Sequence, residues 1–335
     1  MTRRGLILFA SLGIIWGVPY LFIKIAIAEL TPEFLVLARC ALAAALLLPI
    51  AARHRAIRPV LRRWKPLLAF TLFEIVLAWY FINAAEQTLP SSTVGLLLAS
   101  IPLVSIVVAF VLGRRDRLTA INGVGVVLGM LGVAAIVGLD VGGSDLGAVA
   151  QLAVAVVGYA IGPAILARHL HDLPGVGVIA VALGISGLVY LPIVALTGGW
   201  PTSMPSTMTI VSVVVLAVLC SAVAFLLMFA LVAEVGPIRM SAITYVNPAV
   251  AVLAGALFLG EAVSIWTLVG FVTIIAGCAL VTRPDPRAGS RAPQPEPAIA
   301  GADADAGAAL ETQPEHPSLD DVLDEPMPPT EPIVR

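Results

Sequence analysis

Charge, aromatic residues, cysteine and histidine are all scarce in this sequence. Charged residues make up 12% of the 335 positions and aromatic residues 6%, and the chain has three cysteines and four histidines. So small a charged fraction excludes an ordinary soluble domain. The cysteines, Cys40, Cys220 and Cys278, all lie within apolar runs. They read as small buried apolar side chains, and no disulfide framework is indicated.

The motifs that mark an enzyme are missing as well. The sequence has no His-Glu-x-x-His, no Cys-x-x-Cys and no Walker-type phosphate loop, and its histidines fall in loops or near the C-terminus. No apolar run holds a nucleophile beside a base. We therefore predict that the chain is not an enzyme, holds no cofactor or metal ion, has no nucleic-acid partner and does not use ATP as its direct energy source.

Long apolar runs take the place of charge. Hydrophobic residues make up 59% of the chain, and the mean hydropathy is +1.02. A helix of about 20 residues, at about 1.5 Å per residue, crosses a hydrocarbon layer of about 30 Å. The sequence therefore predicts an all-α polytopic membrane protein in a lipid bilayer. The ten predicted transmembrane helices are residues 5–28, 32–52, 66–86, 92–112, 119–139, 146–167, 175–197, 209–232, 239–259 and 264–282.

Lysine and arginine gather at alternate ends of these helices, and cytoplasmic loops are known to collect them. The loops around Thr31, Ser91, Gly142, Trp200 and Ala262 contain none. This asymmetry predicts a protein of the inner or plasma membrane with both termini cytoplasmic. The basic residues after even-numbered helices are Arg53, Arg55, Arg58, Arg62, Arg63, Lys65, Arg114, Arg115, Arg117, Arg168, Arg239 and Arg283.

The membrane part consists of two similar halves. Pro19 recurs as Pro163, 144 positions later, and Pro102 recurs as Pro248, 146 positions later. Each half has five predicted helices, an odd number, so the second half must enter the membrane from the opposite side. The predicted inverted repeats are residues 5–139 and 146–282.

A change of composition follows the second repeat. Residues 284–335 hold 11 Asp and Glu against 3 Arg and are rich in Pro and Ala, whereas residues 1–283 hold 16 Lys and Arg against 10 Asp and Glu. A segment of the first kind has too little apolar surface to fold. We predict that residues 284–335 form a disordered, acidic cytoplasmic tail.

Several motifs occur together in this chain: Trp16-Gly17-Val18-Pro19 with Lys24, then Arg39, Pro102 and Pro248, and Leu259-Gly260-Glu261 followed by Gly270 and Gly277. In these residues the chain resembles a known family, the EamA-type members of the drug/metabolite transporter superfamily. The resemblance covers about residues 5–282 and implies ten helices in two inverted repeats that move a small metabolite, often outward. In one place the chain departs from the pattern, because Arg114-Arg115-Asp116 follows Leu112-Gly113 where the family motif has glutamate, and Asp116 is the candidate replacement.

Three charged residues, Lys24, Arg39 and Glu74, lie at membrane depth. Each costs about 3 kcal/mol or more there unless it is paired or hydrated. Arg39 and Glu74 have two interpretations: a structural ion pair, or a Glu74 carboxyl that binds a proton and couples transport to protons. Lys24 lies near the outer end of its helix, where its side chain can extend to the membrane surface.

Aromatic and amide side chains are the candidates for the wall of a substrate site. Asn83 lies on the opposite helical face from Glu74, so only one of the two can look into a central cavity. Interfacial anchoring and ordinary interhelical hydrogen bonding are the alternative roles. The candidate substrate-binding residues are Trp16, Tyr20, Trp79, Asn83, Tyr159, Tyr245 and Asn247. The candidate helix breaks are Pro19, Pro102, Pro163 and Pro248.

We predict a secondary transporter that alternates access to a site between the two repeats. The resemblance supplies the substrate class, a small metabolite such as an amino acid or a related amphipathic compound, and the outward direction. Protons are the candidate coupling ion, and nothing in the sequence fixes the oligomeric state. The alternative is a non-transporting membrane sensor or scaffold that recruits a partner through the acidic tail.

Overall fold

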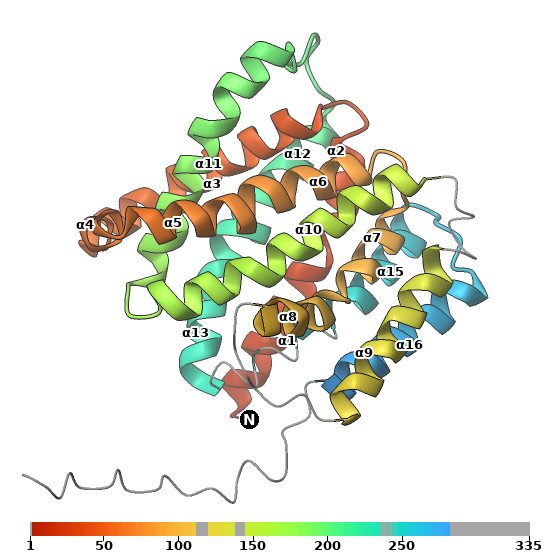
Figure 1. Ribbon diagram of the computed structural model, residues 1–335. Coiled ribbons are helices and arrows are strands. Elements are labelled where there is room, and N and C mark those ends of the chain that lie inside the picture. The colour runs from red at the N-terminus through yellow and green to blue at the C-terminus, as the bar shows by residue number, and fades with distance from the viewer. Residues whose placement is uncertain are drawn as a thin grey trace, which may run out of the picture. The chain divides into compact units, whose positions relative to one another are not determined.

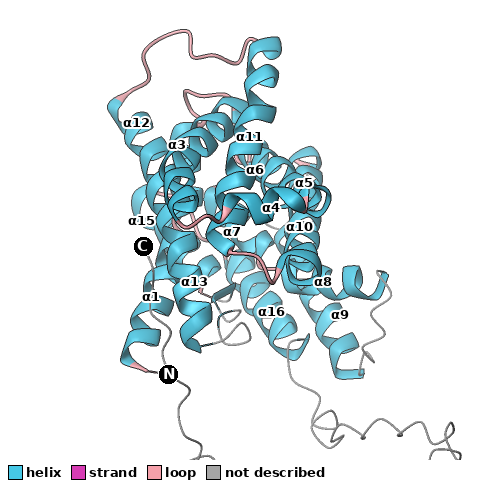
Figure 2. Cartoon of the chain, turned by 90° about the vertical axis from the view of Figure 1, so that its left-hand side faces the viewer, coloured by secondary structure: helices cyan, strands magenta, loops and turns pink. Residues whose placement is uncertain are grey.

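The computed structural model describes residues 2–111, 120–137, 145–235, 240, 243–244 and 246–281. Across these residues the chain forms helices and loops and no strand (Figure 2). The prediction of an all-α chain is therefore confirmed for the part that the structure describes. The tail predicted at residues 284–335 lies outside it.

The first half holds five helical segments, several of them built from consecutive pieces (Figure 1). The first segment is α1 (Arg3–Gly17) with α2 (Pro19–Ala26), and the second is α3 (Pro32–Arg53). The third is α5 (Trp64–Thr71), the π-helix η1 (Leu72–Leu77) and α6 (Ala78–Ala85). The fourth is α7 (Ser91–Leu98) with α8 (Ile101–Val111), and the fifth is α9 (Ala120–Ala135). The short α4 (Ile57–Arg62) connects the second segment to the third.

The second half follows the same plan. The sixth segment is α10 (Leu146–Ile165) with the π-helix η3 (Leu166–Leu170), and the seventh is α11 (Gly175–Thr197). The eighth is α12 (Thr207–Val214), the π-helix η4 (Val215–Val223) and α13 (Ala224–Val235). The ninth is α15 (Asn247–Phe258), and the tenth is α16 (Ile265–Val281).

These ten segments of the described residues follow the order of the ten predicted transmembrane helices. Seven are long and apolar enough to cross a membrane, and the shorter three are Ile121–Ala135, Asn247–Phe258 and Ile265–Leu280. The ninth was predicted from residue 239, but α15 begins at Asn247. Pro248 explains the difference, because a residue without a backbone N–H fits best in the first turn of a helix.

Local signals set several helix ends. The Thr31 hydroxyl accepts a hydrogen bond from the Phe34 amide at 3.3 Å, ahead of Pro32 in the first turn of α3. The Ser206 hydroxyl accepts one from the Thr209 amide at 3.2 Å and starts α12 in the same way. Gly198, with φ at +69°, ends α11 in the left-handed conformation that glycine adopts without strain.

The helices pack in a pattern that is unchanged when the two halves are exchanged. Equivalent segments pair directly: α3 with α11, α7 with α15 and α9 with α16. The remaining contacts also correspond between the halves. The sixth segment, through α10, packs on the third segment and on α8 of the fourth. In the same way, the first segment packs on the eighth segment and on α15 of the ninth. Figure 1 shows α9 beside α16 and α10 beside α6. Two repeats related by a twofold axis produce this pattern.

Glycines allow the closest of these pairings, between α9 and α16. A Cβ atom on Gly132 would lie 2.8 Å from the Gly270 carbonyl oxygen, and one on Gly277 would lie 2.6 Å from the Gly125 carbonyl oxygen. Small residues at helix interfaces let backbones approach in this way. These glycines therefore let α9 and α16 pack closely.

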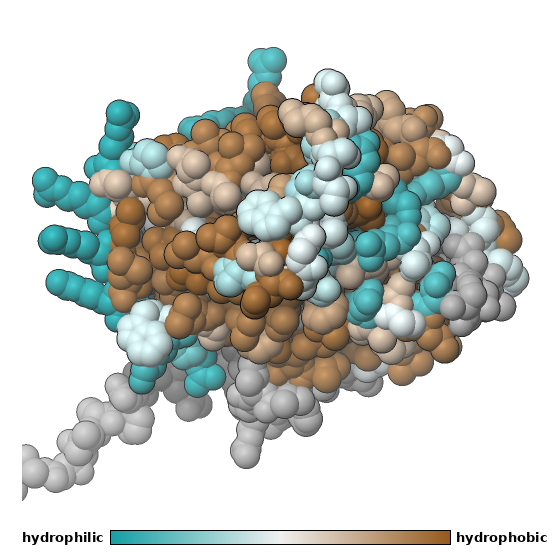
Figure 3. All heavy atoms as spheres, turned by 90° about the horizontal axis from the view of Figure 1, so that it is seen from above, coloured by the Kyte–Doolittle hydropathy of each residue, from teal (hydrophilic) through white to brown (hydrophobic). Residues whose placement is uncertain are grey.

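Apolar side chains cover much of the outer surface, as Figure 3 shows in brown. Long polar side chains project on the side where α4 lies. An exposed apolar surface of this extent suits lipid-facing helices. Together with the length of the helices, it shows a multi-pass membrane protein. Large exposed apolar residues include Val127, Leu131, Leu188, Leu257 and Val272.

Candidate functional site

A buried arginine joins the two halves of the bundle. Arg39 of α3 is 8% exposed, and its Nε donates a hydrogen bond to the Ser221 hydroxyl of η4 at 2.9 Å. The guanidinium carbon lies 3.7 Å from the ring centroid of Trp79, on α6. This is a cation–π contact, which is strongest where water is excluded. The other four N–H groups of the guanidinium make no hydrogen bond to the residues that the structure describes.

A second charged side chain at membrane depth, Glu74, lies on the third segment. Glu74 of η1 packs against Gly162 of α10, and its Oε2 atom is buried with no hydrogen bond in the described part of the chain. Arg39 and Glu74 form no ion pair; the ion pairs among described residues are Arg4–Glu234 and Arg63–Asp172. The structural pair considered from the sequence is therefore wrong for this conformation. Arg39 instead contacts Trp79 and Ser221.

The π-helix η1 changes the relative directions of Glu74 and Asn83, which lie on opposite faces of an α-helical wheel. In a π-helix the backbone bonds join residues i and i+5, so the side chains after η1 are rotated relative to an α-helical wheel. Glu74 of η1 contacts Gly162 of α10, and Trp79, five positions later, contacts Arg39 of α3. The separation of Asn83 from Glu74 by half a turn does not hold across η1.

Two of the π-helices, η1 and η4, accept side-chain hydrogen bonds that the sequence does not reveal. The Tyr190 hydroxyl of α11 donates a hydrogen bond of 2.6 Å to the carbonyl of Val76 in η1. The Ser221 hydroxyl donates one of 2.8 Å to the Leu216 carbonyl in η4. The two π-helices, η1 and η4, lie in equivalent segments of the two halves. Each places a polar side chain in the interior, Glu74 from η1 and Ser221 from η4.

The aromatic candidates divide into two groups. Tyr159 of α10 interacts electrostatically with Glu74 and Arg39, and Tyr20 of α2 interacts with Tyr159 and Arg39. Arg39 therefore interacts with both tyrosines, and its guanidinium lies against the Trp79 ring. Trp16 lies elsewhere, in an edge-on contact with Phe225 of α13 at 6.2 Å between ring centroids. The predicted candidate Tyr245 lies outside the described residues.

The two candidate asparagines, Asn83 and Asn247, form hydrogen bonds near helix ends. The Asn83 amide donates a hydrogen bond of 3.3 Å to the Pro32 carbonyl at the start of α3. The Asn247 amide, oriented to donate, lies 3.1 Å from the Gly13 carbonyl and 3.2 Å from the Ile243 carbonyl. Both residues therefore act as interhelical ties, the alternative role considered for them.

The four prolines lie at three kinds of position. Pro19 begins α2 after the one-residue junction at Val18, and Pro248 lies in the first turn of α15. Pro102 is the second residue of α8, after a break at Ala99 and Ser100. Pro163 corrects our expectation of a break, because α10 continues through it to Ile165. The irregular backbone appears after it, as η3.

The Lys24 side chain has partners in the connection that follows α6. Its ammonium donates hydrogen bonds to the Glu86 carbonyl at 2.6 Å and to the Leu89 carbonyl at 2.9 Å. These carbonyls lie just past the C-terminal end of α6, where the helix dipole favours a positive charge. Lys24 therefore ties α2 to the connection between α6 and α7.

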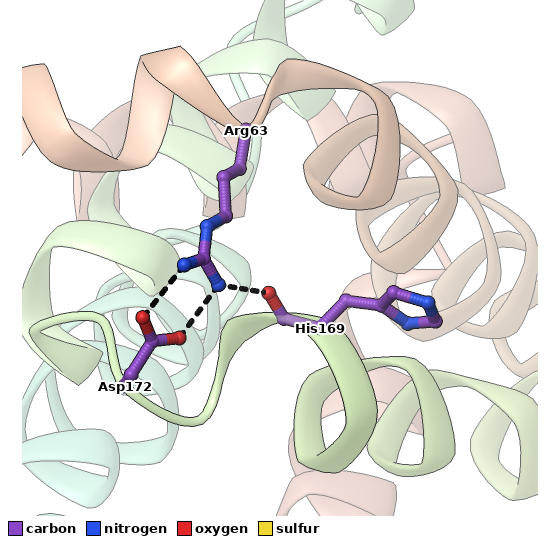
Figure 4. A network of polar contacts seen from close by, with 3 residues as sticks. All are labelled: Arg63, His169 and Asp172. Carbon is purple, nitrogen blue, oxygen red and sulfur yellow. Dashed lines mark hydrogen bonds and ion pairs between the residues drawn. The ribbon is translucent and has the colours of Figure 1, made fainter. Parts of the chain in front are cut away.

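At the opposite end of the bundle an exposed ion pair joins two connections. Arg63 binds the Asp172 carboxylate through two hydrogen bonds, at 2.6 and 2.7 Å, and the His169 carbonyl at 2.8 Å (Figure 4). Arg63 lies between α4 and α5, and Asp172 lies between η3 and α11. Although partial burial acts to raise the pKa of Asp172, hydrogen bonds from its own amide and from Arg63 outweigh it and lower the pKa.

No cluster of metal-ligating side chains occurs in the part of the chain that the structure describes. The candidate residues that the structure describes beside Arg39 or in electrostatic contact with it are Trp79, Ser221, Tyr20 and Tyr159, and Tyr159 also interacts with Glu74. Aromatic rings with a few polar groups are typical of the walls of small-molecule sites.

Proteins of known sequence and structure match this chain along both halves. The model of the EamA-like transporter family matches it twice, at residues 3–138 and 146–283. The "Uncharacterized inner membrane transporter YedA" of Escherichia coli strain K12 is 29% identical over 279 residues, which is 81% of this chain and 88% of YedA. The "Uncharacterized transporter YvbV" of Bacillus subtilis strain 168 is 27% identical over 287 residues, 84% of this chain and 92% of YvbV.

A solved crystal structure shows the same fold. It superimposes with a TM-score of 0.60 at 18% sequence identity and covers 84% of this chain and 97% of its own. At that identity the likeness concerns the fold alone.

Proposed function

The chain belongs to the EamA-like transporter family, and from that premise we propose that it exports a small amphipathic metabolite, such as an amino acid, by secondary transport. It is a membrane transporter, as its family and relatives show. The substrate class, the direction and the site between the repeats are our proposal. The observation that carries it is the buried Arg39 guanidinium, which has no carboxylate partner among the described residues.

A buried positive charge is costly unless an anion compensates it. The Trp79 ring and the Ser221 hydroxyl offset part of this cost. A substrate carboxylate would offset more, because the guanidinium presents paired N–H groups that match the two oxygens of a carboxylate. The site therefore favours a substrate that carries a carboxylate, with the rings of Tyr20 and Tyr159 beside its apolar part.

Glu74 supplies the second half of the recognition. Tyr159 interacts electrostatically with both Glu74 and Arg39, which form no ion pair with each other, and our proposal places the substrate between these two groups. The ammonium group of an amino acid would compensate Glu74 as its carboxylate compensates Arg39. Without substrate, a proton on Glu74 would serve the same purpose. Because substrate and proton would compete for one carboxylate, binding of either favours release of the other, and this couples their movements.

Alternating access requires places where the helices can change shape. The π-helices η1 and η4 lie beside the site at equivalent positions of the two repeats, and π-helical turns often lie at functional sites. The carrier would lie in the inner or plasma membrane with both termini in the cytoplasm, as the distribution of basic residues predicts.

The test is transport by the purified protein in lipid vesicles, with amino acids and their carboxyl amides as paired substrates. We expect amino acids to be preferred about tenfold or more, and Arg39→Gln to abolish the preference. Arg58→Gln, which removes an exposed charge near α4, is the matched control and should keep it. Thermal unfolding of each variant separates loss of recognition from loss of folding. An unchanged preference in a folded Arg39→Gln protein would exclude Arg39 as the carboxylate site.

The same assay separates the carrier from a sensor or scaffold that acts through its acidic tail. A sensor would bind substrate without flux, and its output would depend on residues 286–335. A carrier should retain its flux after deletion of these residues, because so polar a segment contributes no apolar surface to the bundle.

A further inference from the structure

The outer end of the bundle, defined by the loops around Thr31, Ser91 and Gly199, holds a second buried carboxylate. Glu86 follows α6 directly and is 0% exposed. Neither of its carboxylate oxygens has a hydrogen bond in the described part of the chain. The Ser91 hydroxyl is also 0% exposed, and it too forms no hydrogen bond with the described residues. A buried carboxylate without donors is stable only if it is neutral or if a cation reaches it.

Burial without a hydrogen-bond donor among the described residues favours the neutral form of Glu86 in this conformation, the Lys24 charge opposes it, and the Glu261 charge adds to it. Lys24 is the nearest cation, but its ammonium is engaged with the backbone carbonyls of Glu86 and Leu89 and forms no ion pair with the carboxylate. Glu261 faces Glu86 from the connection before α16, and Tyr20 faces it from α2. Neither of these two groups offers a positive charge.

Glu261 itself remains a carboxylate. Its two oxygens accept hydrogen bonds from the amides of Ser91 and Ser92, at 2.7 and 2.9 Å, at the start of α7. Partial burial acts to raise the pKa of Glu261, but these hydrogen bonds outweigh it and lower the pKa. Gly260, with φ at +64°, turns the chain so that Glu261 reaches α7. The lasting negative charge beside Glu86 disfavours a second one.

We propose that Glu86 is a proton-binding site that controls a latch formed by Lys24 at the outer end. With the proton bound, Glu86 is neutral and the Lys24 ammonium holds the carbonyls past α6. When the O–H bond of the Glu86 carboxyl breaks, the proton passes to water and the electron pair stays on the carboxylate. The Lys24 ammonium then pairs with that carboxylate, leaves the two carbonyls and releases α2 from the connection between α6 and α7.

This inference rests on the proposed transport only for the role of the latch. In that role, a low external pH protonates Glu86 and keeps the outer end of the carrier closed. The proton site itself is measured without substrate and without flux. Failure of the transport proposal and failure of the latch are therefore distinguishable.

The test follows the accessibility of Leu89, which is 1% exposed and whose carbonyl accepts a hydrogen bond from Lys24. The Leu89→Cys protein in lipid vesicles is treated with a maleimide that does not cross membranes. Thr88→Cys, at the exposed neighbouring position, gives the reaction rate of an accessible thiol at each pH. The unsubstituted chain gives the background from its buried cysteines.

We expect the ratio of the Leu89→Cys rate to the Thr88→Cys rate to rise about tenfold between about pH 5 and about pH 8. Adding Glu86→Gln, a neutral side chain of the same shape, should hold the ratio low at both pH values. Adding Lys24→Met should hold it high at both. Adding Glu29→Gln, which removes an exposed carboxylate of the same end, should leave the response intact.

Two results would overturn the proposal. One is a ratio independent of pH in the protein with native Glu86 and Lys24, which needs no variant at the site. The other is a normal pH response in the protein with Glu86→Gln.

Discussion

In the first repeat, buried or half-buried charges lie on or beside helices of the bundle interior, whereas the described charges of the second repeat lie at helix ends and in connections. The packing of the two repeats is nonetheless equivalent. The second repeat contributes small and neutral groups to the interior, such as Gly162 against Glu74 and Ser221 against Arg39. The buried or half-buried charges meant in the first repeat are Lys24, Arg39, Glu74 and Glu86, and the described charges of the second repeat are Arg168, Asp172, Glu234 and Glu261.

This difference shows how a repeated backbone can form an asymmetric site. Exchange symmetry brings η1 and η4 to equivalent places, but only η1 carries a carboxylate there. One repeat supplies the ionic groups, and the other supplies the surface that lets them approach. A bound molecule with opposite charges at its two ends would meet both contributions at once.

Substitution of Gly158 tests the small, neutral surface that the second repeat presents to η1. A Cβ atom there would lie 2.5 Å from the Phe73 carbonyl oxygen, so Gly158→Ala should push η1 away from α10 and destabilise the fold by about 1–3 kcal/mol. Gly147→Ala, on the same helix with no atom within 4 Å of the new Cβ, is the matched control. It should be neutral or slightly stabilising. Thermal unfolding in detergent measures both, and equal effects would contradict the close approach of η1.

Substitution of Glu74 tests the role of the charged groups that the first repeat supplies. If Glu74 exchanges a proton for substrate, Glu74→Gln should remove a difference of about tenfold in flux between acidic and alkaline pH, while the protein stays folded. Glu29→Gln should keep the wild-type pH profile. A normal profile in Glu74→Gln would exclude Glu74 as the coupling residue.

Stability measurements test whether the two charges are independent. Because Arg39 and Glu74 form no ion pair, the stability losses of Arg39→Gln and Glu74→Gln should add to within about 0.5 kcal/mol in the double variant. A double variant clearly more stable than that sum would show that the two residues pair in the membrane.

The contribution of the second repeat to Arg39 can be measured at Ser221. Ser221→Ala removes the hydroxyl that accepts the Arg39 Nε hydrogen bond and should cost about 1 kcal/mol. Ser212→Ala is the control, since the Ser212 hydroxyl bonds only the Met208 carbonyl of its own helix. Equal losses would mean that Arg39 gains nothing from η4.

Sequence patterns anticipate most of the fold. Apolar length, basic residues and recurring prolines indicate ten helices, and the structure has ten apolar segments in the described residues in that order. The glycine contacts between α9 and α16 also follow from spacing. Irregular backbone was less visible, because η1, η3 and η4 consist of residues that fit an α-helix equally well.

The candidate site was anticipated in part. Arg39, Glu74, Trp79, Tyr20 and Tyr159 stand out as polar or aromatic residues in apolar helices, and in the structure Arg39 contacts Trp79 and interacts electrostatically with both tyrosines. Their partners were missed because hydroxyl groups carry little signal. A serine such as Ser221 is common in membrane helices, and only the approach of η4 to α3 gives it a role.

The smallest effect is expected outside the membrane interior, at the pair of Arg63 and Asp172. The Asp172 pKa is lowered in the folded protein, so the pair stabilises the fold above the ordinary aspartate pKa of about 4, and this contribution is lost as the pH falls through the lowered value. Both side chains are nearly half exposed, which keeps the effect small. Asp172→Asn should lower the unfolding temperature slightly at neutral pH and have no effect near pH 3. Arg62→Gln, which removes a neighbouring exposed charge, should show no such pH dependence. A large loss of flux in Asp172→Asn would instead place this connection in the transport cycle, and ionic chemistry would then matter in both repeats.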